Sequence, residues 1–82
     1  MASFLYYCGI MYSKKENYSM ARYTFKVATL FEHTPSIREL GILCVKGHGG
    51  DVDIEEGSRL LYLAERRGDE TASLALDSYF EF

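Results

Sequence analysis

The chain has 82 residues, of which 48% are hydrophobic and 15% aromatic, and its formal net charge is −3. These values fit one small folded domain and exclude an intrinsically disordered chain. No run of eighteen apolar residues is present, so no membrane-spanning helix is predicted.

The charge is divided unevenly along the chain. Residues 1–35 carry four basic and two acidic side chains, whereas residues 36–82 carry five basic and ten acidic ones. Because no extended basic stripe results, we do not expect nucleic acid as a partner. Because no spanning segment is predicted, we do not expect a membrane as a partner either. The acidic C-terminal half is compatible with attraction to a basic protein surface and equally with an ordinary solvated face.

Two helices are predicted in the N-terminal part of the chain. Apolar residues favour a first helix from Ala2 to Tyr12, and the polar stretch 13–17 interrupts it. Asn17 is a suitable N-cap, since its side chain can accept a hydrogen bond from an amide of the first turn. We therefore expect a second helix from Tyr18 to about Glu32.

A third helix is predicted between a proline and a glycine-rich turn. Pro35 suits the first turn of a helix, where its missing amide proton is harmless, so the helix is expected over Ser36 to about Lys46. Three of the four residues at 47–50 are glycines, which take left-handed dihedral angles at little cost. They predict a tight turn between two helices.

The fourth and fifth helices are marked by acidic starts. Asp53, with Glu56 three residues on, predicts the N-cap of a helix over 54–67 through an Asp variant of the capping box. Gly68 is expected to end that helix in a left-handed conformation. Asp69 then begins a fifth helix, which runs through Tyr79.

The sequence repeats itself when it is displaced by 36 residues. The matched positions are Phe4 with Leu40, Cys8 with Cys44, Ala21 with Gly57, Phe25 with Leu61, Ala28 with Ala64, Ser36 with Ala72, and Leu40 with Leu76. A fixed period in this range predicts a solenoid, in which each unit packs against its neighbours. Gly57 within a helix indicates a close helix crossing, because glycine otherwise costs about 1 kcal/mol there.

The second unit carries a recognisable pattern of glycines and apolar residues. Its residues are Leu40-Gly41, Gly47-His48-Gly49, Asp53, Gly57, Leu60-Leu61, Ala64-Glu65 and Gly68. This pattern resembles the Sel1-like repeat, a relative of the tetratricopeptide repeat. It departs from that family with Cys44 for an aromatic residue, Gly57 for Ala, Leu60 for Trp and Glu65 for Ala.

The resemblance implies an architecture for the whole chain. Residues 1–35 match the pattern more weakly, and residues 69–82 correspond only to the first helix of a third unit. The expected fold is an all-α solenoid of antiparallel helix pairs within one domain, 1–82. It comprises two Sel1-like repeats, about 1–35 and 36–68, and one extra helix in the half unit 69–82, which makes five helices. The family serves protein binding, and the resemblance implies no catalytic residues.

No chemistry-bearing constellation emerges from the remaining residues. Cys8 and Cys44 are equivalent positions in neighbouring units, about 10 Å apart, which is too far for a disulfide. We expect both to be reduced, buried and structural, as in a cytoplasmic chain. His33 and His48 have no partner at a metal-ligand spacing. We therefore expect no metal, no cofactor and no enzymatic activity.

The first helix is apolar around most of its circumference. The first helix of a solenoid has a neighbour on one side only, and a polar outer face normally keeps such an end soluble. Here that polar cover is missing, so Tyr7 and its neighbours predict an exposed interaction surface. The alternative is that the second helix covers most of this surface.

The family resemblance also implies a concave groove lined by the first helix of each unit. The groove positions are Ala2, Tyr6 and Ile10, then Arg38, Ile42 and Lys46, then Leu74, Ser78 and Phe82. Tyr6 and Ile42 are expected to be apolar anchors, and Arg38 and Lys46 to read charge. The predicted partner-binding residues are Tyr6, Tyr7, Ile10, Arg38, Ile42, Lys46 and Ser78.

The expected function is a small adaptor or regulator that binds a partner protein or peptide through this groove and the apolar first helix. One alternative is a stand-alone inhibitor, such as a toxin-neutralising immunity protein or a phage-encoded anti-defence protein. Another is a homodimer formed through the first helix.

Overall fold

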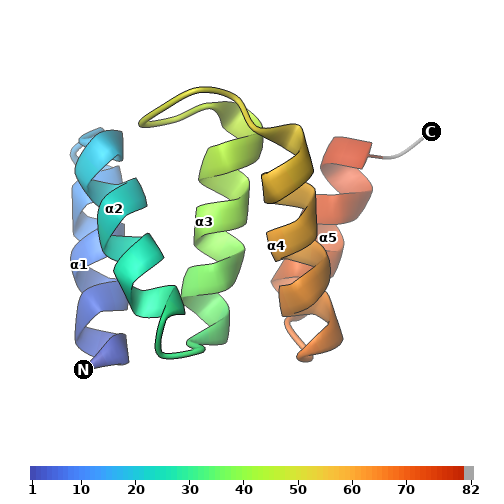
Figure 1. Cartoon of the computed structure of the whole chain (residues 1–82), viewed down its shortest axis with the longest axis horizontal. Helices are drawn as coiled ribbons and strands as arrows, with labels where there is room; N and C mark the ends of the chain where they lie inside the picture. Colours follow the sequence, from blue (N-terminus) through green and yellow to red (C-terminus); the bar gives the residue numbers. More distant parts are fainter. Residues whose placement is uncertain (81–82) are drawn as a thin grey trace.

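A computed structural model describes residues 1–80, which form five α-helices and no strand (Figure 1). The helices are α1 (Ala2–Lys14), α2 (Tyr18–Thr29), α3 (Thr34–Lys46), α4 (Ile54–Arg66) and α5 (Glu70–Phe80). Over the described residues, the prediction of an all-α chain with five helices is confirmed. None of these helices is both long enough and apolar enough to cross a membrane.

The helices run alternately up and down, and each packs on the next one in the chain (Figure 1). Helix α1 contacts α2, α2 contacts α3, α3 contacts α4, and α4 contacts α5. Helices α1, α3 and α5 point the same way, so their C-terminal ends lie on the side of the long α3–α4 loop. This end of the molecule holds the pocket described below.

The start of α4 is set by a local signal. A carboxylate oxygen of Asp53 accepts a hydrogen bond from the backbone amide of Glu56 at 3.0 Å, as predicted. The Glu56 side chain instead receives two 2.8 Å hydrogen bonds from Arg59. Only one half of the expected capping box is therefore present. Gly68, with φ of 95°, follows the end of α4 in the left-handed region, also as predicted.

Other helix ends differ from the sequence prediction. Asn17 occupies the N-cap position of α2 as predicted, but its side chain makes no capping hydrogen bond, so that part of the prediction is wrong. Helix α2 ends at Thr29, since the next three amides bond to carbonyls three residues back and Glu32 turns left-handed with φ of 56°. Helix α1 continues to Lys14, and α3 begins at Thr34, two residues earlier than expected.

Burial follows the 36-residue repeat through most of the core. Phe25 and its equivalent Leu61 are both 0% exposed. The pairs Ala28 with Ala64 and Ser36 with Ala72 are likewise fully buried. The repeat fails at the N-terminal end, where Phe4 is 69% exposed although its equivalent Leu40 is buried. Phe4 lies on α1, which has a neighbouring helix on one side only.

Two helix contacts depend on the absence of a side chain. A Cβ atom on Gly57 would lie 2.9 Å from the carbonyl oxygen of Gly41 and 2.5 Å from Cγ2 of Val45. The predicted close crossing of α3 and α4 is thus confirmed. A Cβ on Gly9 would lie 2.5 Å from the Phe25 ring, so α1 and α2 also meet at a glycine.

Candidate partner-binding pocket

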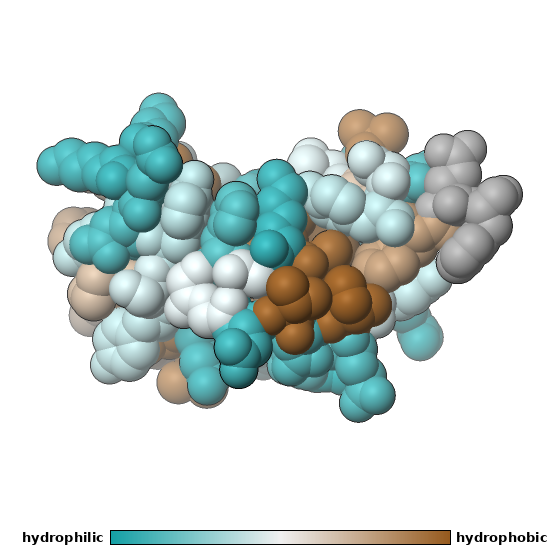
Figure 2. All heavy atoms as spheres, turned by 90° about the horizontal axis from the view of Figure 1, so that it is seen from above, coloured by the Kyte–Doolittle hydropathy of each residue, from teal (hydrophilic) through white to brown (hydrophobic). Residues whose placement is uncertain are grey.

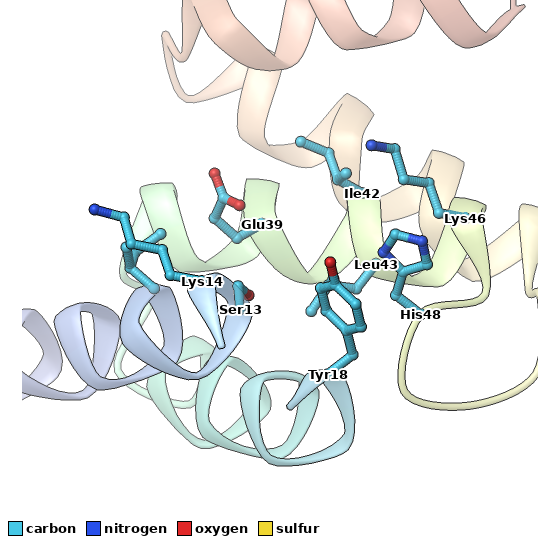
Figure 3. A pocket seen from close by; sticks show the side chains of 9 residues that line it. Ser13, Lys14, Tyr18, Glu39, Ile42, Leu43, Lys46 and His48 are labelled. Atoms are coloured by element: carbon cyan, nitrogen blue, oxygen red, sulfur yellow. The ribbon is translucent and has the colours of Figure 1, made fainter. Parts of the chain in front are cut away.

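A hollow of about 350 Å³ opens between α1 and α3, and we call it the α1–α3 pocket (Figure 3). It is lined by Ile10, Ser13, Lys14, Tyr18, Glu39, Ile42, Leu43, Lys46 and His48. Three of the predicted partner-binding residues, Ile10, Ile42 and Lys46, meet here. Two of them, Ile10 and Lys46, occupy equivalent positions of the two units.

The pocket has an apolar base and an aromatic end. Ile10 comes from α1, and Ile42 and Leu43 come from α3. The rings of Tyr18 and His48 stack at one end, with their centroids 4.3 Å apart and their planes inclined by 32° (Figure 3). The other six lining residues carry polar or charged groups, so the pocket offers both apolar contact and hydrogen-bonding groups to a ligand.

The α3–α4 loop supplies His48 and is held against α2. Gly49 has φ of 83°, and a Cβ there would lie 2.3 Å from the carbonyl oxygen of Tyr18. Arg22 of α2 donates hydrogen bonds to the carbonyl oxygens of His48 at 3.3 Å and Asp51 at 3.2 Å. Arg22 thereby fixes one end of the pocket. No local sequence pattern indicates this role, because the bonds join residues 26 and 29 positions apart.

Tyr6 and Arg38 contact one another and do not line the pocket. Arg38 Nη2 donates to the Tyr6 hydroxyl at 3.2 Å, and Arg38 Nη1 donates to Asp69 at 2.9 Å. Arg38 also forms a 3.1 Å ion pair with Glu39. Its side chain is only 13% exposed, so these bonds link α1, α3 and the start of α5 within the fold. This placement favours a positioning role over the expected one of reading a partner's charge.

The pKa of Arg38 reflects its position between two carboxylates within the fold. Burial acts to lower the pKa of Arg38, but the carboxylates of Glu39 and Asp69 outweigh this effect and raise it. The guanidinium therefore stays charged. Asp69 also accepts a 2.9 Å hydrogen bond from the amide of Ala72 with its second oxygen, and so caps α5.

The remaining predicted partner-binding residues lie outside the pocket. Tyr7 is 65% exposed on α1, where Phe4 and Met11 are also exposed. The expected exposed apolar surface on the first helix is thus present, and α2 does not cover it. Ser78 is exposed on α5, and Phe82 lies outside the described residues.

The two cysteines differ in their surroundings. Cys44 is buried, its pKa is raised by that burial, and its Sγ accepts a 3.4 Å hydrogen bond from Arg22. Cys8 is half-buried and borders a second hollow, of about 220 Å³, beside Met11 and Tyr12. Both thiols are free. The predicted burial is therefore correct for Cys44 and wrong for Cys8, because α1 lies at the end of the row of helices.

No set of three His, Cys, Asp or Glu side chains within residues 1–80 is arranged to hold a metal ion. Comparison of the chain with protein-family models, with curated proteins and with solved structures gave no match.

Proposed function

We propose that the chain is a Sel1-like solenoid that works as a small, non-catalytic protein-binding module. Three features support the solenoid: each helix packs mainly on its neighbours in the chain, burial repeats with the sequence period, and a glycine-mediated crossing joins α3 to α4. In this proposal α1–α2 and α3–α4 are the two repeats, and α5 is the extra helix.

The observation that carries the binding role is the α1–α3 pocket. Its apolar base is formed by side chains from both repeats, while Lys14 and Lys46 stand exposed at its rim. Peptides commonly bind such hollows by inserting an apolar anchor and placing polar groups at the edge. A bound segment would therefore contact both repeats at once.

A second surface favours an adaptor over an inhibitor that binds a single target. Phe4, Tyr7 and Met11 recur at three- and four-residue spacing on α1, and none of them lines the pocket. Residues at that spacing share one face of a helix. The chain thus offers two separate apolar surfaces, as an adaptor that joins two partners requires.

The proposal is tested with defined peptides. A randomised peptide library is selected on the immobilised chain, and the enriched peptides are synthesised with a fluorescent label. Their affinities are measured for the wild type, for Ile42→Asp in the pocket, and for Glu55→Lys on α4, which contributes no residue to the pocket. Circular dichroism and urea unfolding show whether each variant is folded, and Ile10→Ser serves as a second pocket variant.

We expect Ile42→Asp to weaken peptide binding at least about tenfold, because a buried apolar anchor contributes roughly 1.5–3 kcal/mol. Glu55→Lys should bind like the wild type. Peptides that bind all folded variants with equal affinity, or a selection that enriches none, would contradict the proposal.

A further inference from the structure

Two lysines from different helices stand at the rim of the α1–α3 pocket. Lys14 comes from the last turn of α1 and Lys46 from the last turn of α3. Figure 3 shows them on opposite sides of the pocket, with Glu39 and Ile42 between them. Among the described residues, neither ammonium group takes part in an ion pair.

The single carboxylate at the pocket is already engaged. Arg38 forms ion pairs with both Glu39, at 3.1 Å, and Asp69, at 2.9 Å, so its single charge offsets the charge of Glu39 only in part. With two lysines and one partly neutralised carboxylate, the pocket lining keeps a net positive charge. Lys46 Nζ lies 5.9 Å from the centroid of the Tyr79 ring, a contact that leaves the positive charge in place. The pocket therefore presents positive charge on both sides of an apolar base.

From this arrangement we infer that the pocket binds an acidic protein segment with an apolar side chain between two carboxylates. The apolar side chain would rest on Ile10 and Ile42, and the carboxylates would face Lys14 and Lys46. This inference rests on the proposed function, and it adds the chemistry of the partner. A basic segment would meet repulsion from both sides, which makes the pocket selective.

Lys14 and Lys46 make the rim of the pocket positive, although the chain as a whole has a net charge of −3. Of the acidic residues that the structure describes, only Glu39 lines the pocket. A second copy of this chain could also supply carboxylates, for example from the exposed Glu70 and Asp77 of α5. Self-association is therefore one outcome that the experiment must identify.

The experiment uses the labelled peptides whose binding requires Ile42. Their content of Asp and Glu is compared with that of the unselected library, and their affinities are measured for Lys14→Glu, Lys46→Glu and Lys15→Glu. Lys15 is the matched control, because it adjoins Lys14, carries the same charge and does not line the pocket. Each measurement is made at low and at high salt, and sedimentation gives the mass of the unliganded chain.

Asp and Glu should be enriched on both sides of an apolar residue, and Lys14→Glu and Lys46→Glu should each weaken binding by about three- to tenfold at low salt. High salt should reduce that difference, and Lys15→Glu should have little effect. Ile42-dependent peptides without acidic residues, or an equal response to all three lysine variants, would overturn the inference and leave the proposed function standing. A dimer that Lys46→Glu dissociates would also overturn it, because the occupant would then be a second copy. If no peptide depends on Ile42, the proposed function itself is wrong.

Discussion

At the scale of single residues, the fold depends most visibly on a missing side chain. Gly57 and Gly41 face each other where α3 and α4 cross, and backbone atoms occupy the space that a Cβ on Gly57 would need. A rotamer change cannot relieve a contact with backbone, so the two helices would have to move apart. Gly57 remains in the middle of a helix despite its low helix propensity.

Gly57→Ala should lower the free energy of unfolding by up to about 2 kcal/mol. Replacing glycine gains about 1 kcal/mol of helix propensity, but overpacking typically costs about 1–3 kcal/mol and here involves backbone. Urea unfolding measures the difference. Ser58→Ala, at the adjacent position of α4, is the control and should change stability by no more than about 0.5 kcal/mol. A more stable Gly57→Ala would contradict the close crossing.

The burial of a single residue is predicted correctly where the helix that carries it has a neighbouring helix on both sides. Gly57 and Cys44 lie in the second repeat, flanked by helices, and both are buried as expected. Cys8 lies one period earlier on the terminal helix and is only half-buried. The contact of Gly9 with Phe25 was not predicted, because the equivalent position in the second repeat is Val45 and the sequence period gives no glycine there.

At the scale of helices, two starts that share a repeat position behave differently. Asp53 accepts a hydrogen bond from the α4 backbone, whereas Asn17, 36 residues earlier, makes none at the start of α2. Both are good capping residues by type. The sequence therefore identifies where each helix begins but not whether its cap forms, because capping depends on the backbone angles at that residue.

The two caps make a matched pair for measurement. Asp53→Ala should lower the free energy of unfolding by about 1 kcal/mol, since it removes a formed capping bond. Asn17→Ala should change it by less than about 0.5 kcal/mol, because no such bond is lost. Thermal or urea unfolding of both variants and of the wild type measures these two differences in the free energy of unfolding. Equal losses for the two substitutions would contradict the description of these helix starts.

At the scale of the whole molecule, the helices are joined by long-range bonds that no local pattern predicts. Arg22 connects α2 to the α3–α4 loop, and Arg38 connects α1, α3 and the start of α5. The sequence predicted the number of helices, the glycine turn and the period of burial, because those depend on local composition. The repeat position of Arg38 predicts contact with a partner. That position cannot show that Asp69 and Tyr6 lie beside Arg38 in the fold.

The molecule also presents contrasting surfaces on its exterior. Seen from the end that carries the α3–α4 loop, a compact apolar area adjoins hydrophilic atoms (Figure 2). Val52 in that loop and Ile54 at the start of α4 are both exposed. A binding measurement must therefore distinguish the α1–α3 pocket from the outer face of α1 and from these two exposed residues.

The most direct test is to map the amide chemical shifts of the 9.4 kDa chain as a selected peptide is added. We expect the largest changes at the pocket, above all at Ile10, Ile42 and Lys46, with little change along α4. Changes confined to the outer face of α1, around Phe4 and Met11, or to Val52 and Ile54, would contradict binding in the α1–α3 pocket.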